Sequence, residues 1–143
     1  MDYDPQNPFA RILRGELPCV KVYEDAHTLA MMDIMPQAEG HVLVLPKEAA
    51  AELFALSDDG AAACIRTTKK VAAAVKAALG APGVMVAQFN GASAGQTVPH
   101  VHFHIVPRQQ AAPLIPHASK QADIGELQAL AARIIAALDA SAP

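Results

Sequence analysis

The sequence predicts an α+β domain, in which a five-stranded antiparallel sheet is combined with one long helix, a short N-terminal helix and a C-terminal helix. Three observations support this fold class. Several short apolar stretches have the length of strands, and one long segment carries apolar residues at helical spacing. Two connections, residues 24–28 and 89–101, are too short for the crossover helix that parallel neighbours need, so the strands are expected to pair antiparallel.

Local signals place the short helix and the strands. The short helix is expected from Pro8 to Arg14, where Gly15 ends it. Residues 20–24 alternate between apolar and polar, as a half-buried strand does, and Pro46 ends a later apolar run. The five expected strands, in chain order, are 20–24, 28–33, 41–45, 83–89 and 101–106.

Capping residues place the two longer helices. Ser57 can cap a helix whose first turn carries two aspartates, and Gly80 is expected to end that helix. Asp123 can cap a last helix that runs through Leu138. The expected apolar stripe of the long helix consists of Ile65, Thr68, Ala72, Val75 and Leu79.

The length of 143 residues fits a single domain, 1–143, with one core. Hydrophobic residues make up 52% of the chain but aromatic residues only 4%, and much of the apolar content is alanine. Alanine-rich faces bury little area each, so a second subunit would help to stabilise the domain, and we expect a homodimer. The net charge of −3 and the lack of a basic run argue against a nucleic-acid partner.

The compartment expected for the protein is the cytoplasm. The first residues are acidic and polar, unlike a signal peptide, and no stretch has the length and hydropathy of a membrane span. The chain has only two cysteines, Cys19 and Cys64, and this number excludes a disulfide framework and a four-cysteine zinc site. Two reduced thiols are expected, and a single disulfide between them stays the alternative.

The most informative segment contains three histidines at alternate positions: His100, His102 and His104. On a strand these side chains share one face, about 6.5–7 Å apart, while Val101 and its alternate neighbours point to the other. Neutral imidazole is a good nucleophile near neutral pH, and neighbouring imidazoles can fix its tautomer and donate to phosphate oxygens. The pattern therefore indicates nucleophilic and acid–base chemistry at phosphorus.

Two other interpretations of the histidines stay open at this point. Each imidazole can be a structural residue with satisfied hydrogen bonds, although three in strict alternation make this less favoured. A metal site is the second alternative, because His-x-His can place two imidazoles on one ion. A third ligand would have to come from elsewhere, since no Asp, Glu or Cys lies nearby in sequence. His27 and His117 match no pattern and are expected at the surface.

The loop before the histidines has a composition that suits the binding of an anion. Residues 90–97 are small and mostly polar, with glycines that let the backbone approach a ligand closely. Taken alone, this segment could equally be an ordinary loop between two strands. Its position directly ahead of the histidines favours a phosphate-binding role.

At these residues the sequence resembles the histidine triad (HIT) superfamily. The family motif is His-φ-His-φ-His-φ-φ, with φ apolar, and residues 100–106 fit it throughout. The similarity covers roughly residues 8–108, and the C-terminal extension, 109–143 with its helix, resembles bacterial members. The other segments that resemble family signatures are 94–98, 9–12 continuing to 16–18, and 32–38 followed by 40–47.

The resemblance implies a role for each site residue. His102 would be the nucleophile that forms a nucleotidyl-histidine, with His104 and His100 orienting, donating protons and stabilising charge, and His41 supporting the array. Asp33 would accept both ribose hydroxyls. The residues implied in phosphate binding are Asn90, Gly95, Gln96 and Thr97, and those implied around the base are Phe9, Ile12, Met31, Ile34 and Leu43.

The resemblance also implies a substrate and an assembly. The substrate would be a purine nucleotide, an AMP or GMP derivative cleaved by a nucleoside phosphoramidase, and two subunits would form a ten-stranded sheet. A dinucleoside polyphosphate hydrolase and a non-catalytic nucleotide-binding module are the alternatives. No cofactor or metal is expected, because the Cys-x-x-Cys of zinc-binding relatives is missing around Cys19. The spacing from Asn90 to His100 is one residue shorter than in the phosphoramidase branch, and the chain has no tryptophan.

Overall fold

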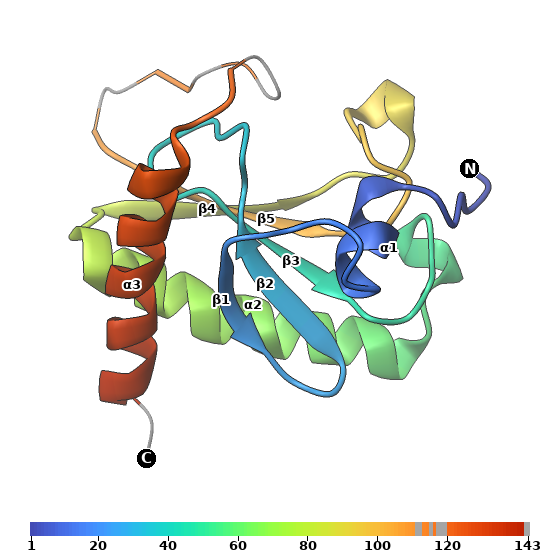
Figure 1. Cartoon of the computed structure of the whole chain (residues 1–143), viewed down its shortest axis with the longest axis horizontal. Helices are drawn as coiled ribbons and strands as arrows, with labels where there is room; N and C mark the ends of the chain where they lie inside the picture. The colour runs from blue at the N-terminus through green and yellow to red at the C-terminus, as the bar shows by residue number, and fades with distance from the viewer. Residues whose placement is uncertain (111–112, 115, 117–119, 142–143) are drawn as a thin grey trace.

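The computed structural model describes residues 1–110, 113–114, 116 and 120–141 and confirms the α+β class (Figure 1). Each expected helix and strand is present, with small differences at the ends. The elements are α1 Pro8–Leu13, β1 Lys21–Glu24, β2 Thr28–Met32, β3 Val42–Pro46, the 3-10 turn η1 Leu53–Ala55, α2 Asp58–Leu79, β4 Gly83–Gln88, the 3-10 turn η2 Ala92–Ala94, β5 Phe103–Arg108 and α3 Ile124–Ser141.

The five strands form one antiparallel sheet in the order β1-β2-β3-β5-β4. The central strands β2 and β3 are buried along their whole length. Because side chains alternate between the two faces of a strand, each of these strands contributes to two separate apolar clusters. One cluster lies under α2, and the other lies under α1 on the opposite face.

The pairing of β3 with β5 positions the histidines. Leu43 pairs directly with His104, and Leu43 belongs to the cluster under α1. Directly paired residues of an antiparallel sheet point to the same face, so His104 also lies on the α1 side. In contrast, Val44 and Phe103, the next pair along, contribute to the core under α2.

The helix caps are confirmed. The Ser57 side chain accepts a hydrogen bond from the backbone N–H of Gly60 at 3.0 Å, which caps α2. Gly80 ends α2 in the left-handed region, with φ at +59°. Asp123 accepts from the backbone N–H of Glu126 at 3.0 Å at the start of α3.

The expected apolar stripe of α2 is partly wrong. Ile65 is 52% exposed, whereas the buried positions of α2 include Cys64, Thr67 and Val71. On this face Thr67 bonds to Thr28 of β2 at 2.7 Å. The buried face of α2 therefore includes a hydrogen-bonded threonine that hydrophobicity does not select.

The remaining expectations concern the last helix, two histidines and membranes. α3 packs across α2 and extends to Ser141, beyond the expected end at Leu138 (Figure 1). His27 is exposed, whereas His117 lies outside the described residues. No helix within the described part of the chain has both the length and the hydropathy that a membrane crossing requires.

Candidate active site

A cavity of about 400 Å³ opens on the α1 side of the sheet, between α1, β2, β3 and the segment before the histidines. Its wall is mostly apolar, with Asp33 and His102 among its few polar side chains. The structure brings together all of the residues expected around the ribose and the base: Phe9, Ile12, Met31, Asp33, Ile34 and Leu43. Thr97 of the expected phosphate loop lines the same cavity, next to this set.

The segment that carries the histidines is less regular than the sequence suggests. The expected strand 101–106 is wrong at its start, because β5 begins at Phe103. Ahead of it, the backbone N–H of Val101 bonds to the carbonyl of Ala50 at 2.9 Å, outside the sheet ladder. Only His104 therefore lies within a strand. His100 and His102 are positioned by other contacts.

A backbone carbonyl fixes the tautomer of His102. Nδ1 of His102 lies 2.7 Å from the carbonyl oxygen of His100. A carbonyl oxygen can only accept, so Nδ1 donates its proton and Nε2 carries the lone pair of the neutral ring. The ring of Phe9 meets the His102 ring edge-on, with centroids 4.9 Å apart. His102 thus lines the cavity with its nucleophilic nitrogen defined.

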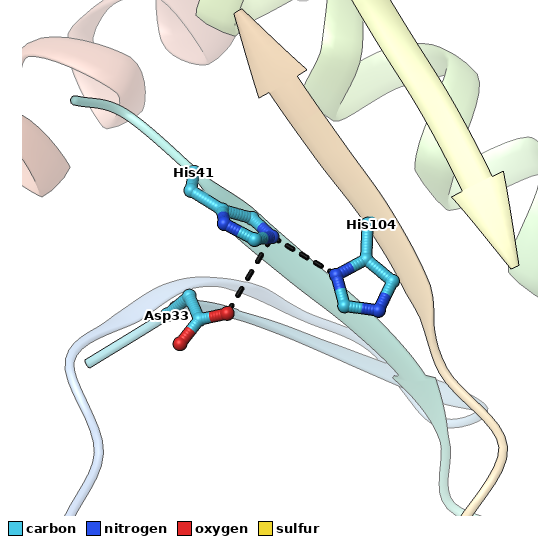
Figure 2. A group of neighbouring side chains, drawn as sticks. All are labelled: Asp33, His41 and His104. Atoms are coloured by element: carbon cyan, nitrogen blue, oxygen red, sulfur yellow. Dashed lines mark hydrogen bonds and ion pairs between the residues drawn. The ribbon is translucent and has the colours of Figure 1, made fainter. Parts of the chain in front are cut away.

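A backbone amide sets the tautomers of His41 and His104 in the same way. The N–H of Gln37 donates to Nδ1 of His41 at 3.0 Å, which leaves the ring proton on Nε2. That Nε2 donates to Nδ1 of His104 at 3.0 Å, so the proton of neutral His104 lies on its Nε2 (Figure 2). The His102 and His104 ring centroids are 4.9 Å apart. The lone pair of His102 Nε2 and the N–H of His104 therefore lie on neighbouring rings.

His100 is held by the protein at both ring nitrogens. Nε2 donates to the carbonyl of Pro46 at 2.8 Å, and Nδ1 lies 2.8 Å from the hydroxyl of Tyr3. The side chain is fully buried, and this burial lowers the pKa of His100, so the ring is neutral near pH 7. Of the roles expected for His100, orientation is the one that these contacts support.

Asp33 carries a buried oxygen suited to a donor from outside the protein. Its Oδ1 accepts from the backbone N–H of Met35 at 2.8 Å. Its Oδ2 is buried, lies 3.5 Å from Nε2 of His41, and makes no hydrogen bond among the described residues (Figure 2). A buried carboxylate oxygen without a donor is costly, and hydroxyl groups of a bound ligand would satisfy it.

Asp33, His41 and His104 also form a cluster that could hold a metal ion, with ligand atoms within 4.8 Å of one another. The sequence interpretation missed this cluster, because His104 lies 63 residues from His41 and the fold brings the two segments together. The hydrogen bonds argue against a metal there. Nδ1 of His41 accepts a hydrogen bond from the N–H of Gln37, so the proton of the neutral ring lies on Nε2. Nε2 therefore has no lone pair to offer a metal. A metal on Nε2 would require an imidazolate or a rearranged turn.

The loop between β4 and β5 is braced by its own side chains. Gly91 and Gly95 have φ values of +91° and +105°, which favour glycine. Gln96 accepts from the N–H of Gly91 at 2.8 Å and donates to the carbonyls of Ala51 and Val98. Its buried side chain thereby holds the loop closed.

Asn90 fixes the other end of this loop. Its Oδ1 accepts from the N–H of Leu53 at 2.8 Å, and its side chain exchanges two hydrogen bonds with that of Gln88. Both Asn90 and Gln96 therefore bond to the protein itself. Phosphate contact by Asn90, Gly95, Gln96 and Thr97 stays a prediction.

Sequence reasoning missed three residues that contact the histidines. Gln37 was seen only as part of a family signature, and nothing in the sequence pointed to Tyr3 or Phe89. Each triad histidine has an aromatic neighbour. The centroid distances are 5.6 Å for Tyr3–His100, 4.9 Å for Phe9–His102 and 5.3 Å for Phe89–His104. No periodic pattern could have found these contacts, since they join segments far apart in the chain.

The fold and the site together define a mostly apolar cavity that ends at a histidine array, and comparison with known proteins places the chain in a family. Residues 14–111 match the HIT domain, and the chain belongs to the HIT family. It is 46% identical over 100 residues to adenosine 5′-monophosphoramidase hnt1 of Schizosaccharomyces pombe, covering 70% of this chain and 72% of that protein.

One solved structure and one further relative are also similar to this chain. A crystal structure of a HIT-like protein from Bartonella henselae superposes with a TM-score of 0.90 at 42% identity, covering 96% of this chain and 99% of that one. Adenylylsulfatase HINT3 of Arabidopsis thaliana is 36% identical over 102 residues, covering 71% of this chain and 52% of that protein. The expected membership of the HIT superfamily is confirmed.

Proposed function

We propose that this HIT-family nucleotide hydrolase cleaves the bond between phosphorus and the leaving group of a nucleoside monophosphate derivative, through a covalent nucleotidyl-histidine on His102. One observation carries the proposal. Nε2 of His102 holds a lone pair beside the N–H of His104, at the wall of a cavity that can contain a nucleoside.

The geometry supports a two-step reaction. Nε2 of His102 attacks phosphorus and the bond to the leaving nitrogen breaks, so that the amine departs after taking up a solvent proton. The Nδ1–H of His102, bonded to the His100 carbonyl, stabilises the positive charge that develops on the ring. The N–H of His104 stabilises a phosphate oxygen. Water then attacks phosphorus, which releases the nucleoside monophosphate and restores His102.

A purine nucleoside phosphoramidate, derived from AMP or GMP, is the substrate we propose. Two of the relatives are named adenosine 5′-monophosphoramidase and adenylylsulfatase, which supports an adenylate group on the retained side. The buried Oδ2 of Asp33 without a hydrogen-bond donor supports a role in accepting the ribose hydroxyls, and the apolar wall around Phe9 and Leu43 suits a flat base. The reaction needs no cofactor or metal.

A substrate panel tests this function. We expect the highest kcat/KM for adenosine phosphoramidate, with lower values for dinucleoside polyphosphates and nucleotide sugars. His102→Ala is expected to abolish turnover while nucleotide binding persists, and EDTA is expected to change nothing. Turnover that persists in His102→Ala would contradict the mechanism. Loss of turnover in EDTA, restored by a metal, would show that a metal is required.

We further propose that two copies pair along β4 into a ten-stranded sheet. β4 is an edge strand of the described sheet, and its apolar residues are only half-buried, with Val86 48% exposed. An open apolar edge is a natural site for strand pairing. The cytoplasm is the compartment we propose, because Cys19 and Cys64 are both free thiols, as a reducing environment would keep them.

A further inference from the structure

Tyr3 contacts the histidine array from the opposite end of the chain. It lies in the segment ahead of α1, half-buried, 97 residues from its partner His100. Its hydroxyl oxygen lies 2.8 Å from Nδ1 of His100, and its ring stands 5.6 Å from the His100 ring. Neither the family signatures nor the proposed reaction gives this residue a role.

The direction of the Tyr3–His100 hydrogen bond follows from the other ring nitrogen. Nε2 of His100 faces the carbonyl of Pro46 at 2.8 Å and must donate to it. In the neutral ring, Nδ1 then carries the lone pair, so the hydroxyl of Tyr3 is the donor. The fully buried His100 side chain therefore has both nitrogens satisfied in one orientation and one tautomer.

These two hydrogen bonds to the His100 ring affect the tautomer of His102, the proposed nucleophile. The carbonyl of His100 accepts the proton of His102 Nδ1 at 2.7 Å, and this hydrogen bond leaves the lone pair on Nε2. His100 and His102 both precede β5, so no ladder hydrogen bond of the sheet fixes that carbonyl. Its position depends on the ring contacts of His100 and on the bond from Val101 to Ala50.

We propose that Tyr3 is a positioning residue for His102, acting through the ring and the carbonyl of His100. The role in catalysis rests on the proposed function. Without the hydroxyl, the buried lone pair of His100 Nδ1 loses its donor, and the ring is free to change its tautomer or tilt. The carbonyl then holds the Nδ1 proton of His102 less firmly, and a smaller fraction of the molecules presents Nε2 as the nucleophile.

Tyr3→Phe tests this role, because it removes the hydroxyl and keeps the ring against His100. We expect kcat for an adenosine phosphoramidate to fall about five- to thirtyfold, as the loss of one hydrogen bond to a buried group predicts, with KM within about twofold. Tyr23→Phe is the matched control, since the hydroxyl of the chain's other tyrosine bonds to Asp25 at 2.9 Å, away from the histidines. Its kinetics are expected to match the wild type.

A second measurement needs no substrate. Long-range nitrogen–proton NMR of the imidazoles is expected to show His102 protonated on Nδ1 alone in the wild type, and a mixture of tautomers in Tyr3→Phe. Unchanged kcat and an unchanged His102 tautomer would overturn the role of Tyr3, as would an equal loss of kcat in both tyrosine variants. Wild-type protein that fails to turn over any phosphoramidate would instead contradict the proposed function, and the NMR comparison would still decide the role of Tyr3.

Discussion

Backbone groups decide which nitrogen of each histidine carries the proton. The carbonyl of His100 orients His102, the carbonyl of Pro46 orients His100, and the amide of Gln37 sets His41 and, through it, His104. A backbone donor or acceptor cannot change its role, whereas a side-chain hydroxyl can. The array is thus fixed in a state with one nucleophilic lone pair and one adjacent donor.

Asp33 is expected to bind the substrate through its ribose. In Asp33→Asn the buried oxygen loses its charge, so KM is expected to rise about tenfold to a hundredfold, as the loss of charge-assisted hydrogen bonds predicts, with a smaller change in kcat. A 2′,3′-dideoxyribose substrate, which lacks both hydroxyls, provides the control. It is expected to bind less tightly to the wild type and to lose little further affinity in Asp33→Asn. Equal effects of Asp33→Asn on both substrates would contradict a ribose contact.

The buried, neutral His100 predicts a loss of stability in acid. Its pKa in the folded protein lies below the ordinary value of about 6.5, so the folded state binds fewer protons than the unfolded state. The free energy of unfolding is therefore unaffected by this group above about pH 6.5, and falls below it by up to about 1.4 kcal/mol per pH unit. Denaturant unfolding at several pH values measures this, and an NMR titration assigns it to His100. A His100 that titrates above pH 6.5 would contradict it.

At the residue scale, the sequence predicted which polar residues come together but not the residues that hold them in place. Alternation placed the three histidines on one face, and the family resemblance selected Asp33 and His41, which the structure places beside His104. The contact of Tyr3 with His100 joins segments 97 residues apart, which only the tertiary fold brings together, whereas Gln37 contacts His41 within one turn whose geometry no residue pattern specifies. The side chains of Asn90 and Gln96 bond to the protein in ways that no spacing reveals.

At the scale of elements, the site depends on how β3 and β5 enter the sheet. The pairing of Leu43 with His104 carries His104 to the α1 side, and His41, immediately before β3, meets it there. Gly40 allows this turn. Its φ of +92° favours glycine, and a Cβ at this position would lie 2.2 Å from Cδ1 of Leu79 and 3.1 Å from Cγ of Pro107.

Gly40→Ala is therefore expected to lower both stability and activity. Left-handed backbone costs an alanine about 1–2 kcal/mol, and displacing Leu79 and Pro107 adds to that cost and shifts His41. Gly15→Ala is the matched control, because Gly15 has a φ of +79° with no atom within 4 Å of its Cβ position. Denaturant unfolding and kcat measure both effects. A Gly40→Ala protein no less stable than Gly15→Ala, with unchanged kcat, would contradict the role of this turn.

Most elements could be predicted, because capping and turn residues act locally. Ser57, Gly80 and Asp123 mark helix ends in the sequence and in the structure alike. The start of β5 and the buried face of α2 could not be predicted in this way. The first follows a hydrogen bond from Val101 to the distant Ala50, and the second includes Thr67, whose bond to Thr28 of β2 no apolar pattern reveals.

At the scale of the whole molecule, the open edge of β4 predicts an assembly. Val86→Lys places a charge on this half-exposed edge and is expected to convert a dimer into a monomer in sedimentation experiments. Ile135→Lys, at an exposed apolar position of α3, is the control and is expected to stay dimeric. A wild-type protein that sediments as a monomer, or a Val86→Lys protein that stays dimeric, would contradict pairing along β4.

The proposed reaction depends on His102 as the nucleophile, and the mass of the intact protein during turnover tests this role most directly. After rapid mixing with an adenosine phosphoramidate and an acid-free quench, the wild type is expected to gain the mass of one adenylyl group, on the peptide that contains His102. His102→Ala is expected to gain none. An adduct on another residue, or wild-type turnover with no adduct at any time, would contradict this role of His102.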